Sequence, residues 1–348
     1  PRVRPLADAV LGPPVSRRPG SRLARVLTGV LIGLAALIGA GCLYVVGMPG
    51  TSHSGPLPEL TDEQAALAAQ LEEDVRVLAE EIGERNREHP QALIQAENWI
   101  AAELAAAGYS VVREEFTDRE HRFANLVVER KGKTDEIVVV GAHYDAAPGT
   151  PAANDNGSGT AALLALARRL EALEPTKTLR LVAYANEEPP HFQTDAMGSL
   201  VNARRAKERG DRIVAMLSLE TIGYYRDEPG TQPYPFPFSA FYPSEGNFLA
   251  VVGDTSSRAL VHRVVATFRA KAAFPCEGIA APDFVPGVDW SDHWSYWQQG
   301  WPAVMLTDTA VFRYPHYHEP TDTPDKIDYE RLARVVTGIE TVVRELVE

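Results

Sequence analysis

The sequence predicts an α/β fold in which a mixed, mostly parallel sheet is flanked by helices and preceded by one transmembrane helix. Two observations predict the sheet. Short apolar runs alternate with segments of helical length after residue 61, and runs such as 137–140 are continuously apolar, as is typical of strands buried on both faces. A third observation, an uncharged apolar segment at 26–48, predicts the membrane helix.

The apolar segment at 26–48 separates a basic amino end from the rest of the chain. At ~1.5 Å per residue it is long enough to cross a hydrocarbon core of ~30 Å. The arginines of residues 1–25 all precede it, and the first charge after it is Glu59. The positive-inside rule therefore predicts that residues 1–25 lie in the cytoplasm and the body outside it. A cleaved signal peptide, a lipoprotein site at Cys42 and a twin-arginine signal at Arg17 and Arg18 are the alternatives.

Charge divides the chain in the same way. The formal net charge is −13, yet the first 50 residues hold six of the 34 basic residues and one of the 47 acidic ones. Residues 51–348 therefore carry 28 basic and 46 acidic residues, a formal charge of −18. This composition excludes nucleic acid as a partner, because phosphate backbones are bound by clustered Lys and Arg. With only Cys42 and Cys276 in the chain, an internal disulfide framework is also excluded.

Elements of the body can be assigned in order. Residues 49–60, rich in Pro, Gly and Ser, are interpreted as a linker before a domain at 61–348. The first two strands of that domain follow each other closely and are expected to pair antiparallel, so the sheet should be mixed. Helices are expected at 61–82, 91–107, 158–170, 200–208, 255–271 and 329–347, and strands at 109–116, 124–130, 136–142, 178–185, 213–219, 248–254 and 302–307.

Coordinating side chains follow four of these strands. In open α/β sheets, ligands bind at the carboxyl ends of the strands. The residues that follow the strands here are mostly imidazoles and carboxylates. One such residue alone would be an ordinary surface or packing feature, but several at one edge of a sheet indicate a binding site. They are His143 and Asp145, with Asp155 in the next loop, then Glu187 and Glu188, then Glu220, and last Tyr317 and His318.

Imidazole and carboxylate ligands without thiolate suit zinc or another borderline divalent ion. A catalytic zinc takes about three protein ligands and a water, so five candidate ligands are too many for one ion and enough for two if a carboxylate bridges them. The five are His143, Asp155, Glu188, Glu220 and His318.

Six motifs together resemble the dizinc aminopeptidase family, which also contains glutamate carboxypeptidase and the glutaminyl cyclases. The resemblance covers roughly residues 65–345 and implies a three-layer sandwich that acts on peptides. The motifs stand in order along the chain: His-Tyr-Asp at 143, Asn-Asp-Asn-Gly-Ser-Gly at 154, Asn-Glu-Glu at 186, Ser-Leu-Glu-Thr-Ile-Gly at 218, Ser-Asp-His at 291, and Tyr-His followed by Asp-Thr-Pro at 317.

The resemblance implies a role for each of these residues. One zinc would be held by His143, Asp155 and Glu220, and a second by Asp155, Glu188 and His318, with Asp155 bridging. Glu187 would be the general base that activates the bridging water, and Tyr317 would stabilise the oxyanion. Asp145 would hold the other nitrogen of the His143 ring, and Asp292 is either a support of the ligands or a loop cap.

Glu220 departs from the family, which usually has Asp at this position, and the longer side chain could reshape the place where aminopeptidases hold an amino group. Glutaminyl cyclases lack the first histidine, so His143 favours hydrolysis. We expect an aminopeptidase. A carboxypeptidase or dipeptidase with the same site, or a catalytically inactive membrane-tethered binding module, are the alternatives. His316 is a weaker ligand candidate than His318. Residues 224–242, rich in proline and aromatic residues, would wall the substrate pocket, rest on the membrane interface or form a rigid surface loop.

Overall fold

The computed structural model describes residues 20–348, so most of the basic segment predicted at 1–25 lies outside the described residues. The chain divides into two units, Pro1–Tyr44 and Val45–Glu348, which are considered separately here. The second unit, which we call the body, contains the whole sheet.

Helix α1 (Gly20–Val46) contains the apolar segment. Its stretch Ala24–Val46 is long and apolar enough to cross a membrane, although a signal sequence would meet the same criterion of length and composition. The helix ends two residues before the predicted boundary at 48. The body begins at Val45, so it includes the last two residues of this helix, residues 47 and 48, and the segment that follows them.

The body is built on one sheet of eight strands, in the order β1-β2-β4-β3-β5-β8-β6-β7. Strands β1 and β2 pair antiparallel as predicted, β2 with β4 and β6 with β8 are also antiparallel, and the other pairs are parallel. The predicted mixed sheet is thus confirmed. The strands are β1 (Val112–Asp118), β2 (His121–Arg130), β3 (Glu136–His143), β4 (Thr178–Tyr184), β5 (Arg212–Glu220), β6 (Leu249–Gly253), β7 (Cys276–Ala280) and β8 (Ala303–Thr307).

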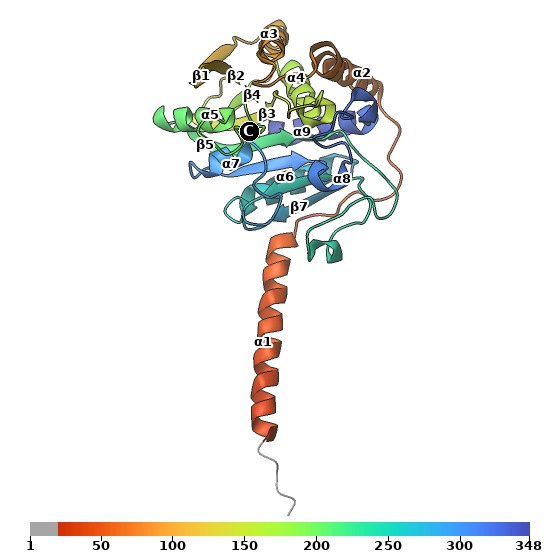
Figure 1. Cartoon of the computed structure of the whole chain (residues 1–348). Coiled ribbons are helices and arrows are strands. Elements are labelled where there is room, and N and C mark those ends of the chain that lie inside the picture. The colour runs from red at the N-terminus through yellow and green to blue at the C-terminus, as the bar shows by residue number, and fades with distance from the viewer. Residues whose placement is uncertain (1–19) are drawn as a thin grey trace, which may run out of the picture. The chain divides into compact units, whose positions relative to one another are not determined.

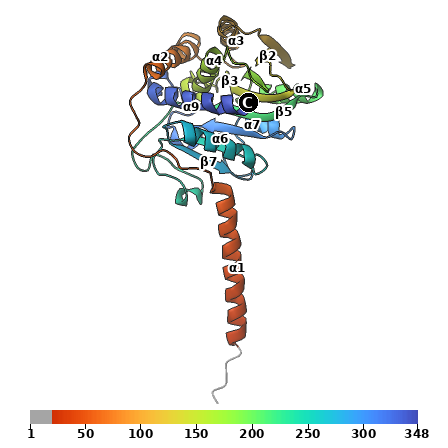
Figure 2. The same cartoon turned by 180° about the vertical axis from the view of Figure 1, so that it is seen from behind.

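Helices cover both faces of the sheet, which gives the three layers expected (Figures 1 and 2). Alternate residues of β3 show why. Val138 and Val140 pack into the cluster shared with α2, α3, α4, α6 and α9, whereas Ile137 and Val139 pack into the cluster shared with α5 and α7. The helices are α2 (Asp62–Arg76), η1 (Val77–Ile82), α3 (Pro90–Ala106), η2 (Ala153–Ser158), α4 (Gly159–Arg169), α5 (Gly198–Glu208), η3 (Phe238–Ala240), α6 (Arg258–Lys271), α7 (His293–Trp297), α8 (Ala310–Arg313), η4 (Pro324–Lys326) and α9 (Tyr329–Val347).

The four strands that precede candidate ligands are neighbours in the sheet. They lie in the order β4-β3-β5-β8, and every pair among these neighbours is parallel. Their carboxyl ends therefore meet at one edge, as the sequence predicted. Close packing of β3 on β4 requires Gly141, because a Cβ there would lie 2.2 Å from the ring of Tyr184.

Two features were not predicted. Strand β7 is not among the predicted strands, because it is short and contains Glu277 and Gly278 and therefore has no apolar run. Part of the segment interpreted as a linker is fixed to the body: the carbonyl groups of Pro49 and Gly50 accept hydrogen bonds from Arg269, and Ser52 accepts one from the backbone of Cys276.

Candidate metal centre

The candidate ligands form two overlapping groups. His143, Asp155 and Glu220 present one set of donor atoms, and Asp155, Glu188 and His318 present another, the atoms of each set lying within 4.8 Å of one another. The structure thus brings together all five residues that the sequence singled out. Their role as metal ligands stays a prediction.

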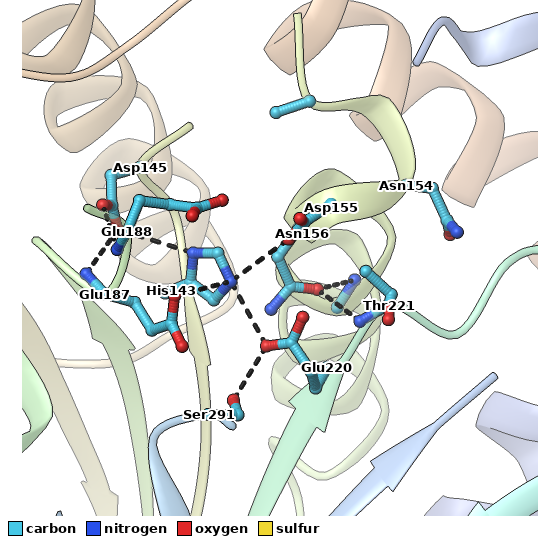
Figure 3. A network of polar contacts seen from close by, with 12 residues as sticks. His143, Asp145, Asn154, Asp155, Asn156, Glu187, Glu188, Glu220, Thr221 and Ser291 are labelled. Atoms are coloured by element: carbon cyan, nitrogen blue, oxygen red, sulfur yellow. Dashed lines mark hydrogen bonds and ion pairs between the residues drawn. The ribbon is translucent and has the colours of Figure 1, made fainter. Parts of the chain in front are cut away.

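Asp155 is the member common to both groups, and it turns a different oxygen to each. Its Oδ1 lies 3.5 Å from Nε2 of His143, and its Oδ2 lies 3.0 Å from Nε2 of His318. Glu220 completes the first group with an oxygen 3.2 Å from His143 Nε2, and Glu188 completes the second with an oxygen 3.2 Å from His318 Nε2. Figure 3 shows His143 between Asp155 and Glu220. A carboxylate placed in this way can bridge two ions.

These spacings fit zinc. Zinc binds nitrogen and oxygen donors at about 2.0–2.2 Å with tetrahedral geometry, which places two donors on one ion about 3.4 Å apart. Several donor atoms are also buried without a hydrogen-bond partner, which is costly unless a cation satisfies them. The atoms are Nε2 of His143 and His318, Oδ2 of Asp155 and Oε1 of Glu188.

The electrostatics of the cluster favour positive charge at its centre. Burial lowers the pKa of His318, but contacts with Asp155 and Glu188 outweigh it and raise that pKa to about 10. Burial likewise opposes the rise at His143, whose pKa Glu187 and Glu220 hold well above its usual value. Buried carboxylates so close together need either protons on these imidazoles or a cation among them.

Asp145 supports the first group from behind. It lies 3.5 Å from Nδ1 of His143, on the side of the ring opposite the candidate ion. Its two oxygens also accept hydrogen bonds of 3.1 Å from the backbone of Glu187 and of Glu188. One carboxylate therefore contacts both the end of β3 and the segment that follows β4, and its role as a support of a metal ligand stays a prediction.

Glu187 and Tyr317 border the two groups that share Asp155. Glu187 also forms a third possible donor group with His143 and Glu188. The carboxylate of Glu187 is buried and lies 3.9 Å from Nε2 of His143. Burial raises the pKa of Glu187 well above its usual range, against the opposing effect of His143. The ring of Tyr317 stacks on that of His318 with centroids 4.0 Å apart. Burial, and next the charge of Asp155, raise the Tyr317 pKa, so the phenol keeps its proton.

Asp292 is buried, and it follows Ser291, a residue whose contact with the cluster the sequence did not predict. Ser291 donates a hydrogen bond of 2.8 Å to Glu220 Oε2, the oxygen that faces His143. Burial raises the pKa of Asp292 to about 7. Ser291 therefore orients the carboxylate of Glu220 toward His143. The motif Ser-Asp-His was its only signal in the sequence.

The loop that carries Asp155 is held by its polar neighbours. Asn154 accepts a hydrogen bond from the backbone of Gly223, and Asn156 exchanges bonds with the backbone of Leu219 and Thr221 at the end of β5. These amides explain the motif around Asp155, because they bind backbone while the aspartate alone turns into the site. His316, the weaker candidate, lies outside the cluster and contacts Thr321.

Asp322 holds the same loop from the other side. Its carboxylate accepts hydrogen bonds from the backbone of Asn154 (2.8 Å) and Asp155 (3.1 Å) and from the hydroxyl of Tyr314 (2.7 Å). We expect Asp322→Asn to destabilise the protein by about 1–3 kcal/mol, because an amide can replace only one of the two accepting oxygens and leaves a buried N–H unpaired. The free energy of unfolding in urea, with chelator present to remove metal linkage, measures this loss.

Asp325→Asn is the matched control for that experiment. Asp325 lies in η4, three residues after Asp322, and it contacts Thr323 and Lys326 at the surface. Its replacement should change the free energy of unfolding by less than about 0.5 kcal/mol. Equal effects of the two substitutions would show that Asp322 does not hold the loop.

An apolar pocket adjoins the cluster at Glu220 and Tyr317. It is walled by the aromatic segment after β5, by β6 and β7, and by the loop before α7. Among its lining residues in the described part of the chain there is no Lys or Arg, and the carboxylates are Glu220 and Glu277. The pocket thus suits an uncharged, apolar group placed beside Glu220.

Comparisons with known proteins agree with this architecture. Residues 125–343 match the model of peptidase family M28. The chain is 38% identical over 287 residues to the uncharacterized protein YfbL of Escherichia coli K12, covering 80% of this chain and 88% of that protein. The chain therefore belongs to peptidase family M28.

More distant relatives carry functional names. A probable leucine aminopeptidase of Arthroderma otae is 26% identical over 263 residues, which cover 70% of this chain and 65% of that protein, less than two thirds of its length. A zinc aminopeptidase of Bacillus subtilis has the same fold, with a TM-score of 0.66 at 17% identity, over 84% of this chain and 97% of that one. These likenesses support a zinc-dependent hydrolase related to aminopeptidases.

Proposed function

We propose that the protein is a zinc aminopeptidase, anchored by residues 24–46 with its body outside the cytoplasm, that removes an apolar amino-terminal residue from peptides. The observation that carries the proposal is the pair of donor groups that share Asp155, set beside an apolar pocket without cationic side chains. Substrate would approach from the side of His318, the most exposed ligand, whose side chain is 34% accessible.

The proposed ligand sets are His143, Asp155 and Glu220 for one ion, and Asp155, Glu188 and His318 for the other. Zinc bound there would polarise the scissile carbonyl and provide a nucleophilic water at neutral pH. Other divalent ions could bind the same donors.

Three side chains would handle protons and charge. Glu187 would take a proton from the attacking water and return it to the leaving amine, and its raised pKa suits a group that must do both. The protonated hydroxyl of Tyr317 would donate a hydrogen bond to the developing oxyanion. Asp145 would hold the ring of His143 and the backbone of Glu187 in position relative to each other.

The shape and polarity of the pocket favour an amino terminus over a carboxyl terminus. A free carboxylate is bound by Arg or Lys, and the pocket beside Glu220 offers neither within the described chain. A carboxylate such as Glu220 can instead accept from the substrate ammonium group. The apolar side chain of the first residue would then occupy the pocket, with the peptide bond over the metal centre.

One observation favours the alternative of a dipeptidase or carboxypeptidase. Arg87 lines a second, smaller hollow, where it is the one Arg or Lys among the lining residues in the described chain, beside the carboxylates Glu88, Asp145 and Glu188. A substrate carboxylate could bind there if the substrate were only two residues long.

We expect the full chain in nonionic detergent to hydrolyse amino-acid amides, with kcat/KM about 10- to 100-fold higher for leucine than for glycine because the pocket buries the larger side chain. Chelator should abolish the activity and zinc should restore it. Peptides blocked at the amino terminus should not be cleaved.

Different outcomes would select the alternatives. Cleavage of blocked peptides, with amides left intact, would establish a carboxypeptidase. A preference for dipeptides that Arg87→Ala weakens through a higher KM would establish a dipeptidase. A zinc-free protein that cleaves none of these substrates would be a membrane-tethered binding module.

A further inference from the structure

Three phenylalanine side chains on the body stand in solvent. Phe236 is 95% exposed, Phe284 is 82% exposed and Phe241 is 44% exposed. Single exposed apolar residues are common, but these three lie on two loops that wall the same pocket. The first loop contributes Tyr234 and Phe238 to the pocket, and the second contributes Val285 and Val288. All three phenylalanines therefore lie on loops that line one pocket.

The surroundings of these side chains are unusually poor in charge. Residues 231–244 contain no Asp, Glu, Lys or Arg, although the body as a whole is strongly acidic. In the second loop Asp283 is next to Phe284, and the negative charge of Asp283 would disfavour contact with an anionic lipid surface. A surface of this composition suits uncharged lipid headgroups, with phenylalanine rings buried at the boundary of the acyl chains.

The first residues of the body pack at this same place. Val45, its first residue, packs against the cluster of Phe248, Ala250 and Val288, which also line the pocket. Met48 lies over Gly278 of β7: a Cβ added at Gly278 would be 3.0 Å from the sulfur of Met48. The segment that follows the helix is thus held against the pocket wall.

The first phenylalanine loop is held to the same strand. The hydroxyl of Tyr242 donates a hydrogen bond of 2.7 Å to the carbonyl of Gly278. Tyr234 and Val285, one from each loop, pack against the same cluster as Val45. In Figures 1 and 2 the loop with η3 lies at the same end of the body as β7. Both loops therefore pack beside the first residues of the body, which directly follow the segment that would anchor the chain in a membrane.

We propose that Phe236, Phe241 and Phe284 insert into the lipid interface of the membrane that residues 24–46 span, so that the apolar pocket opens at the lipid surface. The substrates would then be amphiphilic peptides that are already concentrated in that interface. The membrane contact rests on the proposed anchoring by residues 24–46, and the substrate class rests in addition on the proposed aminopeptidase function.

Collision measurements on the full chain test the contact directly. The Cys42→Ala protein, whose Cys276 is buried, receives one cysteine and a nitroxide label, either as Phe236→Cys or as Phe284→Cys. Each nanodisc holds one chain in phosphatidylcholine. Val112→Cys is the control, because Val112 is 60% exposed on β1, at the sheet edge opposite β7. We expect labels at 236 and 284 to collide about tenfold less with a water-soluble nickel chelate than the label at 112, and more with oxygen, which concentrates in lipid.

Equal nickel accessibility at the three positions would overturn the proposal. Protection that occurs in vesicles with many chains, but not in nanodiscs with one, would also overturn it and assign the surface to a second copy of the chain. Because neither reading requires activity, a failure of the aminopeptidase function would leave this test intact.

A second measurement tests the substrate class. In phosphatidylcholine vesicles, the protein should cleave a leucyl peptide with a carboxy-terminal acyl anchor at about tenfold higher kcat/KM than the same peptide without the anchor. Phe236→Ser combined with Phe284→Ser should remove that preference and leave cleavage of the soluble peptide unchanged. An unchanged preference in the double variant would contradict the role given to these side chains.

Discussion

Replacement of Glu187 by glutamine is expected to lower kcat by about 10²- to 10⁴-fold while leaving the zinc content unchanged. Glutamine has the same shape but cannot take a proton from water. Glu187 lies outside the two groups that share Asp155 but forms a third possible group with His143 and Glu188, so the zinc content of this variant decides between a base and a ligand. Steady-state kinetics with a leucyl amide and metal analysis of the same sample measure the two quantities.

Glu188→Gln is the matched control, because it makes the same chemical change one residue further along the chain. Glu188 lies 3.2 Å from Nε2 of His318 and belongs to the second donor group. Its replacement should lower the zinc content as well as the rate. Full activity in Glu187→Gln would exclude Glu187 as the base, and a loss of zinc in that variant would make it a ligand instead.

Asp155→Asn is expected to weaken both metal sites at once. Each oxygen of Asp155 faces a different histidine, and an amide offers only one good ligand atom and no negative charge. The zinc content should fall from two ions per chain to fewer than one, and activity should fall by at least about 100-fold. Metal analysis after dialysis against a weak chelator measures the occupancy without any reference to catalysis.

Variants of the single histidines test whether Asp155 is a ligand shared by the two metal sites. His143→Ala should weaken the site with Glu220, and His318→Ala the site with Glu188, so that each variant keeps about one ion. If Asp155→Asn lost no more zinc than either histidine variant, Asp155 would serve one ion and the bridging arrangement would be wrong.

Much of the site could be predicted because it depends on strand ends. His143, Glu187 and Glu220 each come at or just after an apolar run, and parallel strands place such residues at one edge. The order of the motifs then indicated which residue corresponds to which ligand. Ser291 and Asp322 could not be assigned in this way, because their hydrogen bonds reach residues far away in the sequence.

The fold was predictable to a similar extent and for the same reason. Continuous apolar runs mark buried strands, so β3, β4 and β5 were found with their neighbours. Strand β7 is different, because its pairing with β6 and the cover provided by Tyr242 stabilise a segment without a strong pattern. Pairing of this kind depends on tertiary contacts and leaves no local period.

The sequence by itself determined the class of the fold, the identity of the ligand candidates and the presence of an apolar helix before an acidic body. These follow from composition, periodicity and spacing along the chain. Only the tertiary structure decided that Asp155 faces two histidines, that Ser291 donates a hydrogen bond to Glu220, and that Tyr234 and Val45 pack against the same apolar cluster. Those facts depend on packing between distant segments, where the hydrophobic effect and buried hydrogen bonds select one arrangement among many that the same local patterns allow.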